Sequence, residues 1–111
     1  MPIHLWAVIS DTRQSVAEIV IVNFTTWRIG HDDSCLLNPG DHPFLQHQTS
    51  VSYRDARIVT LAQLEDLENR GLITPKENLS PDILAKIREE ARISPFAKLK
   101  IREILGKQNL I

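Results

Sequence analysis

Hydrophobic and polar residues form short alternating blocks in the first half of the chain, a pattern typical of β-strands. Ile3–Ser10 and Glu18–Phe24 are nearly continuous apolar runs, and the second predicts a strand buried on both faces. Ser34–Asn38 predicts a short third strand. Phe44-Leu45 and Val51–Val59 predict a fourth strand or two strands, broken by the polar residues between them. Several short strands joined by turns favour a small barrel or roll.

Helical periodicity begins at Thr60. Thr60 and Gln63 have the spacing of a capping box, leucines then recur at helical intervals, and Gly71 is a good helix stop. Ser80-Pro81-Asp82 combines an N-cap residue, a proline suited to the first helical position and an acidic residue that favours the positive end of the helix dipole. The pattern therefore predicts two helices, one after each of these start signals.

Ser94-Pro95 repeats the start signal and predicts a third helix over residues 96–105, because proline interrupts a continuous helix. The strands thus precede the helices, and the predicted fold class is α+β. We expect a single domain in which residues 1–60 form a small antiparallel β-barrel. Residues 61–111 would then form a helical segment packed on the barrel.

Composition narrows the class of protein. The chain has 111 residues, a hydrophobic fraction of 42% and a formal net charge of −1, which together predict one packed domain. This charge argues against nonspecific coating of nucleic acid. No apolar run is long enough to span a bilayer, so no membrane partner is expected. The single cysteine, Cys35, and the absence of an export signal predict a cytoplasmic protein.

The stretch from Cys35 to Tyr53 holds the densest group of residue types suited to acid–base chemistry, including His42 and His47. Metal-independent RNA cleavage needs a base for the 2′-hydroxyl, an acid for the leaving oxygen and a donor for the phosphate. Histidine suits the first two roles. We therefore expect a groove here that binds and cleaves RNA, with both histidines catalytic and no metal or other cofactor.

Candidate phosphate donors are hydroxyl and guanidinium groups on the neighbouring strands. They are Thr25, Thr26, Ser50, Tyr53, Arg54 and Arg57. An alternative interpretation of the two histidines is structural. In it, His42 hydrogen-bonds the Pro39–Asp41 turn and His47 is a solvated loop residue.

Two further groups of polar residues have alternative interpretations. His31, Asp32, Asp33 and Cys35, with the two loop histidines, are metal-ligand types, but their spacing matches no metal motif. The basic residues of the helical segment form either a phosphate-binding face or ordinary solvated side chains, and without interleaved aromatic residues we favour the second. These residues are Arg88, Arg92, Lys98, Lys100 and Arg102.

Several short motifs occur in a characteristic order. HLWAVISD is followed by EIVIVNFTT, by a loop and turn leading to SVSYRDARIVT, and then by LSPDILAKI. Phe24-Thr25-Thr26 matches a strand-end threonine motif, Ser50–Ser52 an S-x-V element, and Ala56–Thr60 the run that follows it. Over residues 3–90 this order resembles the MazF/PemK-like toxins of bacterial toxin–antitoxin pairs.

The resemblance implies an SH3-like barrel with a C-terminal helix, usually in a homodimer. It also implies a metal-independent endoribonuclease of a type II toxin–antitoxin system, which cuts single-stranded RNA and is silenced by a cognate antitoxin protein lying across the groove. The motif threonine of the family falls on Thr26, with Thr25 beside it.

The chain departs from the family at one functional position. Where the family has a catalytic arginine followed by proline, this sequence has Leu5-Trp6 preceded by His4. Either His4, His42, His47 or Arg57 does the work of the arginine, or the fold is a non-catalytic RNA- or protein-binding module. The chain also lacks the first strand of the family. This predicts a sheet edge that is paired in a homodimer or covered by the helices.

Overall fold

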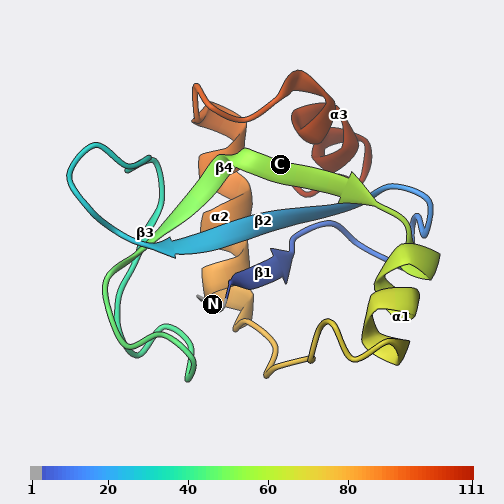
Figure 1. Ribbon diagram of the computed structural model, residues 1–111. Helices are drawn as coiled ribbons and strands as arrows, with labels where there is room; N and C mark the ends of the chain where they lie inside the picture. Colours follow the sequence, from blue (N-terminus) through green and yellow to red (C-terminus); the bar gives the residue numbers. More distant parts are fainter. Residues whose placement is uncertain (1–3) are drawn as a thin grey trace.

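The computed structural model describes residues 4–111 and shows one curled antiparallel sheet with three helices (Figure 1). The strand order in the sheet is β1-β2-β4-β3. The elements, in chain order, are β1 (Leu5–Val8), β2 (Ile19–Thr26), β3 (Leu36–Leu37), β4 (Thr49–Val59), α1 (Leu61–Asn69), α2 (Pro81–Ile93) and α3 (Leu99–Lys107). The α+β class expected from the sequence is confirmed, with strands first and helices after them.

β2 is the centre of the sheet, paired with β1 on one side and β4 on the other. All six residues from Ile19 to Phe24 are buried, so the predicted burial on both faces is confirmed. Val22 and Phe24 join the main hydrophobic core. Ile21 instead lines a hollow that the opposite side of the sheet shares with α1.

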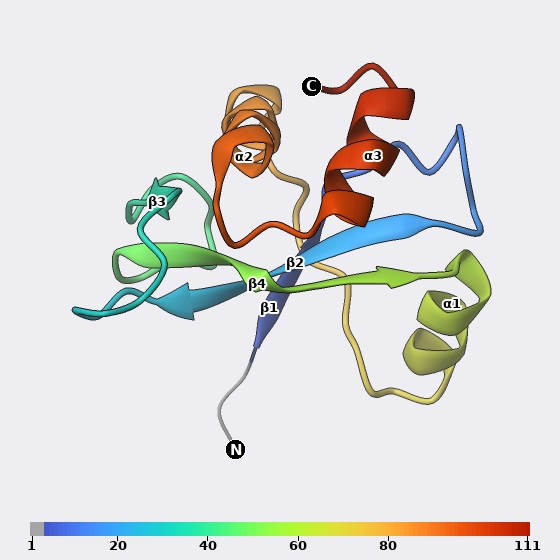
Figure 2. The ribbon, with the colours of Figure 1, turned by 90° about the horizontal axis from the view of Figure 1, so that it is seen from above.

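The helices lie on opposite sides of the sheet. Seen from above, α2 and α3 lie together on one side, and α1 lies on the other (Figure 2). The α2 and α3 side holds the main core, to which α2 contributes Ile87 and Ala91. From α3, Ile101, Ile104 and Leu105 are buried in the same core. The main core thus occupies one side of the sheet, and α1 has no fully buried residue.

The first two predicted helix starts are present. Thr60 Oγ1 accepts from the Gln63 N–H at 3.1 Å, and the Gln63 side chain accepts from the Thr60 N–H at 2.8 Å, which completes the capping box of α1. Ser80 caps α2 through the Ile83 N–H at 3.3 Å. Gly71 follows α1 with a φ of +71°, a left-handed conformation that favours glycine.

Several predicted boundaries were wrong. β1 ends at Val8 rather than Ser10, β2 continues to Thr26, and β3 covers only Leu36–Leu37. Phe44-Leu45 is not a strand, and β4 begins at Thr49 rather than Val51. Thr49 and Ser50 each pair with β2 on one side and with β3 on the other. This backbone pairing makes them part of the strand although both side chains are polar. The third helix spans Leu99–Lys107, later than predicted, because Ile101 and Leu105 supply the face that packs against the core.

Within residues 4–111, no helix has both the length and the apolar character to cross a membrane.

Candidate functional site

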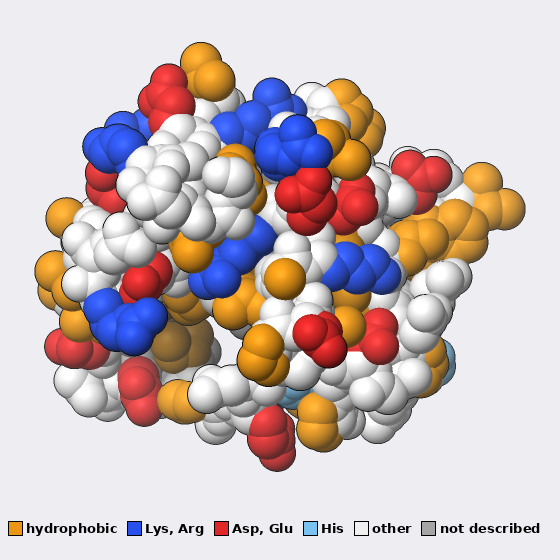
Figure 3. Space-filling view, turned by 180° about the vertical axis from the view of Figure 1, so that it is seen from behind, with side chains coloured by type: hydrophobic (Ala, Val, Ile, Leu, Met, Phe, Trp, Pro, Cys, Tyr) orange, Lys and Arg blue, Asp and Glu red, His pale blue; other side chains and the backbone are white. Residues whose placement is uncertain are grey.

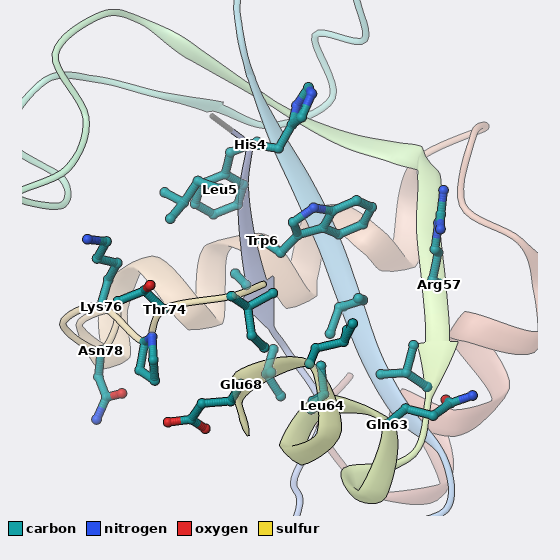
Figure 4. A pocket seen from close by; sticks show the side chains of 18 of the residues that line it. His4, Leu5, Trp6, Arg57, Gln63, Leu64, Glu68, Thr74, Lys76 and Asn78 are labelled. Atoms are coloured by element: carbon teal, nitrogen blue, oxygen red, sulfur yellow. The ribbon is translucent and has the colours of Figure 1, made fainter. Parts of the chain in front are cut away.

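A groove of about 1280 Å³ lies on the side of the sheet away from α2 and α3 (Figure 4). Its walls come from β1, the end of β4, α1 and the segment 72–79, which connects α1 to α2. Half-buried and exposed apolar side chains line it, among them Trp6, Val8, Leu64 and Ile73. The protein thus leaves an apolar surface in contact with solvent at the centre of its second sheet face.

The groove runs along the edge of β1. Five consecutive residues, His4–Val8, line it, although successive side chains on a strand point to opposite faces. In residues 4–111, β1 is an edge strand that pairs with β2 alone. The Ile9 N–H donates to the Val20 carbonyl at 3.0 Å, so the alternating pattern of the ladder turns the N–H and C=O groups of Trp6 and Val8 outward.

Charged side chains of both signs border the apolar floor. The Arg57 guanidinium lies 5.5 Å from the Trp6 ring centroid, and the Lys76 ammonium lies 5.5 Å from that of Phe44. Figure 4 shows Trp6 beside Arg57, with α1 on another side of the groove. Exposed carboxylates on α1, including Glu65 and Glu68, border that side. The groove therefore has an apolar centre, with Arg57 on one side, Lys76 on the opposite side and carboxylates along α1.

The structure places two of the predicted RNA-contacting residues, His4 and Arg57, in this groove, where both are exposed. Arg57 reaches it because the register between β2 and β4 shifts: Asn23 pairs with Ser52, whereas Ile21 pairs with Arg57. The shift turns the Arg57 side chain to the face that carries Trp6.

His42 is enclosed by the protein. Its side chain is only 3% exposed, its Nδ1 accepts from the Phe44 N–H at 3.0 Å, and its Nε2 lies 2.6 Å from the Glu77 carbonyl. Because the carbonyl can only accept, Nε2 carries the proton. Both ring nitrogens are therefore occupied within the fold. This arrangement gives His42 a structural role and leaves no free nitrogen for the catalytic role expected of it.

The other two predicted catalytic residues lie near one end of the sheet. Thr26 pairs with Thr49, whose hydroxyl donates to the His47 carbonyl at 3.0 Å. The side chains of Thr26 and His47 are exposed, and His31 Nδ1 lies 3.1 Å from the Thr26 carbonyl. Of the three residues predicted to be catalytic, His42 is therefore enclosed, whereas Thr26 and His47 are exposed.

Ser50 and Tyr53 are buried residues rather than surface contacts for RNA. The Ser50 hydroxyl donates to the Asp32 carbonyl, and the Tyr53 hydroxyl donates to the Ile87 carbonyl at 2.8 Å. Neither side chain is exposed, and burial raises the pKa of the Tyr53 phenol. Thr25, the partner of Ser50 in the ladder, is half-buried. Tyr53 shares the core face of β4 with Val51, whereas Ser50 lies on the opposite face and is covered by the loop that contains Asp32.

Most basic side chains of the helical segment have partners within the chain. Arg88 and Arg102 donate to backbone carbonyls, and Lys100 pairs with Glu18 at 3.1 Å. Arg92 pairs with Glu89, while Lys98 is exposed. On the side of the molecule opposite to the view in Figure 1, cations and carboxylates are interspersed (Figure 3). The described residues thus form no continuous basic face here, although Arg88 and Arg102 are half-buried rather than solvated as expected.

Among residues 4–111, no three His, Cys, Asp or Glu side chains come together in a geometry that holds a metal ion. Cys35 is buried beside Tyr53, and burial raises the pKa of its thiol.

The sequence interpretation missed the groove because its walls come from separate regions. Trp6 was given no role in binding, yet the structure leaves it half-buried in the groove. Phe44 was assigned to a strand and Lys76 was given no role, yet they meet across more than thirty residues of chain. One signal in the sequence pointed to the groove. The stretch 72–78 carries two apolar residues, Leu72 and Ile73, without a strand or helix to bury them, and the structure leaves both exposed.

Comparisons with protein-family models, curated proteins and solved structures found no match to this chain.

Proposed function

We propose that this protein is a non-catalytic binding module that holds an extended polypeptide segment in the groove beside β1. The observation that carries the proposal is the outer edge of β1, which borders an apolar groove of about 1280 Å³. An added strand would pair with the outward N–H and C=O groups of Trp6 and Val8 and cover the apolar floor. Such strand addition derives affinity from backbone hydrogen bonds and specificity from alternate side chains.

The size and charge of the groove favour a polypeptide over the other ligand classes. Its volume exceeds the roughly 300–1,000 Å³ of typical small-molecule pockets. A nucleic acid would place its phosphates beside the carboxylates of Glu65 and Glu68 on α1. A polypeptide can instead carry a basic residue toward α1 and apolar residues toward Trp6. We therefore infer a ligand in which apolar and basic residues alternate.

The resemblance to MazF/PemK-like toxins remains part of the proposal. A curled antiparallel sheet followed by helices is compatible with an SH3-like barrel, and we propose that finer fold identity for the β-part of the chain. In a toxin of this family the occupant would be an antitoxin segment. A second copy of this chain, presenting its own β1, would give the predicted homodimer instead. Light scattering at several protein concentrations distinguishes these two sources of the added strand.

The proposal predicts that Val8→Pro abolishes strand addition while preserving the fold. The Val8 N–H faces outward, so proline removes no bond to β2, but it blocks an incoming strand. We expect binding of a synthetic peptide with alternating leucine and lysine to weaken about tenfold or more, which corresponds to about 1.4 kcal/mol. Fluorescence anisotropy measures the binding, and thermal unfolding monitors the fold.

Ala7→Pro is the matched control, because it places proline in the same strand at a position whose N–H faces β2. Loss of that hydrogen bond should lower the stability of the fold, which Val8→Pro should not do. A single-stranded RNA oligonucleotide and a peptide with alternating leucine and glutamate complete the panel. Preferential binding of the RNA, or peptide binding that is unchanged in Val8→Pro, would contradict the proposal.

Endoribonuclease activity is the second candidate function. The exposed side chains of Thr26 and His47 near one end of the sheet favour it, because an exposed imidazole and hydroxyl are suited to act on a phosphodiester. If RNA is cleaved there, His47→Ala is expected to lower the cleavage rate about 10²–10⁴-fold. Cleavage of a labelled single-stranded RNA by the purified protein measures this. The matched control is His4→Ala, which removes an exposed histidine from the groove.

A further inference from the structure

The groove has one wall without regular secondary structure. The segment 73–79 contains neither strand nor helix, and all of its residues except Leu79 are exposed. In the part of the chain that the structure describes, its only hydrogen bond to the rest of the protein is the one between the Glu77 carbonyl and His42. The cation–π contact from Lys76 to Phe44 lies beside this bond. The wall therefore depends on contacts with the loop that contains His42.

The loop that contains His42 is well ordered by its own hydrogen bonds. The Asn38 N–H donates to the Asp41 carboxylate at 2.7 Å, and the Asp41 N–H donates to the Asn38 carbonyl at 3.0 Å. The Leu45 N–H then donates to the His42 carbonyl at 3.0 Å. The imidazole thus extends from a closed turn, and its Nδ1 bond to the Phe44 N–H orients the ring so that the Nε2–H points at Glu77.

We propose that His42 is a positioning residue that sets the width of the groove by holding the segment 73–79 against the sheet. The inference rests on the proposed function for its biological meaning, although the hydrogen bond between His42 and Glu77 is present without any ligand. With the bond intact, the wall stands opposite β1. Without it, the segment moves away from the sheet, and an added strand loses its second wall.

Two variants separate the two hydrogen bonds of His42. His42→Gln keeps an N–H donor near the position of Nε2, which can reach the Glu77 carbonyl. His42→Asn keeps an acceptor near the position of Nδ1 but is too short to reach Glu77. We expect trypsin to cleave after Lys76 about tenfold faster in His42→Asn than in the wild type, and at a nearly wild-type rate in His42→Gln.

Nuclear magnetic resonance measurements on the ligand-free protein provide an independent test. Imidazole ¹⁵N shifts report the expected Nε2–H tautomer, and backbone order parameters in 73–79 should be near 0.85 in the wild type and below about 0.6 in His42→Asn. His42→Gln and His4→Gln should both keep values close to those of the wild type. Equal cleavage rates, or equal order parameters, in wild type and His42→Asn would overturn the inference. None of these measurements needs a peptide, so a failure of peptide binding would count against the proposed function alone.

Discussion

Tyr53→Ala is expected to lower the free energy of unfolding by about 3–5 kcal/mol, the range for removing a buried aromatic side chain. The Tyr53 side chain is completely buried in the core between the sheet and α2, and its hydroxyl donates to the Ile87 carbonyl at 2.8 Å. The substitution removes the apolar ring and leaves a cavity at the contact between β4 and α2. Urea unfolding followed by circular dichroism measures the loss.

Two further variants separate the parts of this effect. Tyr53→Phe keeps the ring and loses only the hydroxyl, so it should cost about 0.5–1.5 kcal/mol. Arg54→Ala changes the next residue, whose side chain is exposed, and should cost less than about 1 kcal/mol, including the loss of its cation–π contact with Phe96. A loss below about 1 kcal/mol for Tyr53→Ala would show that the side chain does not join β4 to α2 as the structure places it.

Trp6→Ala is expected to weaken peptide binding in the groove by about 2 kcal/mol or more, which is roughly thirtyfold. Trp6 carries the largest apolar side chain among the residues that line the groove, and the Arg57 guanidinium lies over its ring. Because Trp6 is only half-buried, the fold should tolerate the change better than it tolerates Tyr53→Ala. Titration with the leucine–lysine peptide measures the affinity, and urea unfolding measures the stability.

Arg57→Ala measures the contribution of the cation–π contact separately from that of the Trp6 ring. It removes the cation while keeping the ring, so the expected loss of affinity is about 0.5–1 kcal/mol, the range for an exposed cation–π contact. Leu99→Ala, on a residue of α3 that is 69% exposed and away from the groove, should leave peptide binding unchanged. Unchanged affinity in Trp6→Ala would place the peptide site outside the groove.

The local sequence determined where the principal elements lie. The apolar run around Val20 and Val22 predicts a buried strand, because only a central position in a sheet removes both faces from water. The start of α1 at Thr60 and of α2 at Ser80 was also predictable, because a capping side chain bonds backbone N–H groups only two or three residues away. Such contacts depend on neighbours in the chain.

The tertiary structure decided the properties of the candidate site. Ser50 and Tyr53 are polar types that sequence reasoning assigned to a surface, yet Tyr53 faces the core and the loop that contains Asp32 covers Ser50. The position of His42 also depended on a distant residue, because its Nε2 finds its partner at Glu77 in a segment without regular structure. No pattern within either segment encodes that hydrogen bond.

The groove likewise combines features that the sequence predicted with features that only the tertiary structure shows. The sequence by itself predicted strands, helix starts and an α+β class, and it implied a sheet edge in need of cover. The tertiary structure alone showed that α2 and α3 pack on one side of the sheet, and that Trp6, Arg57 and Lys76 border a groove on the other. The physical reason is that helix caps and apolar periodicity arise between residues close in the chain. The walls of a groove arise from the packing of distant segments, which is determined only when the whole core forms.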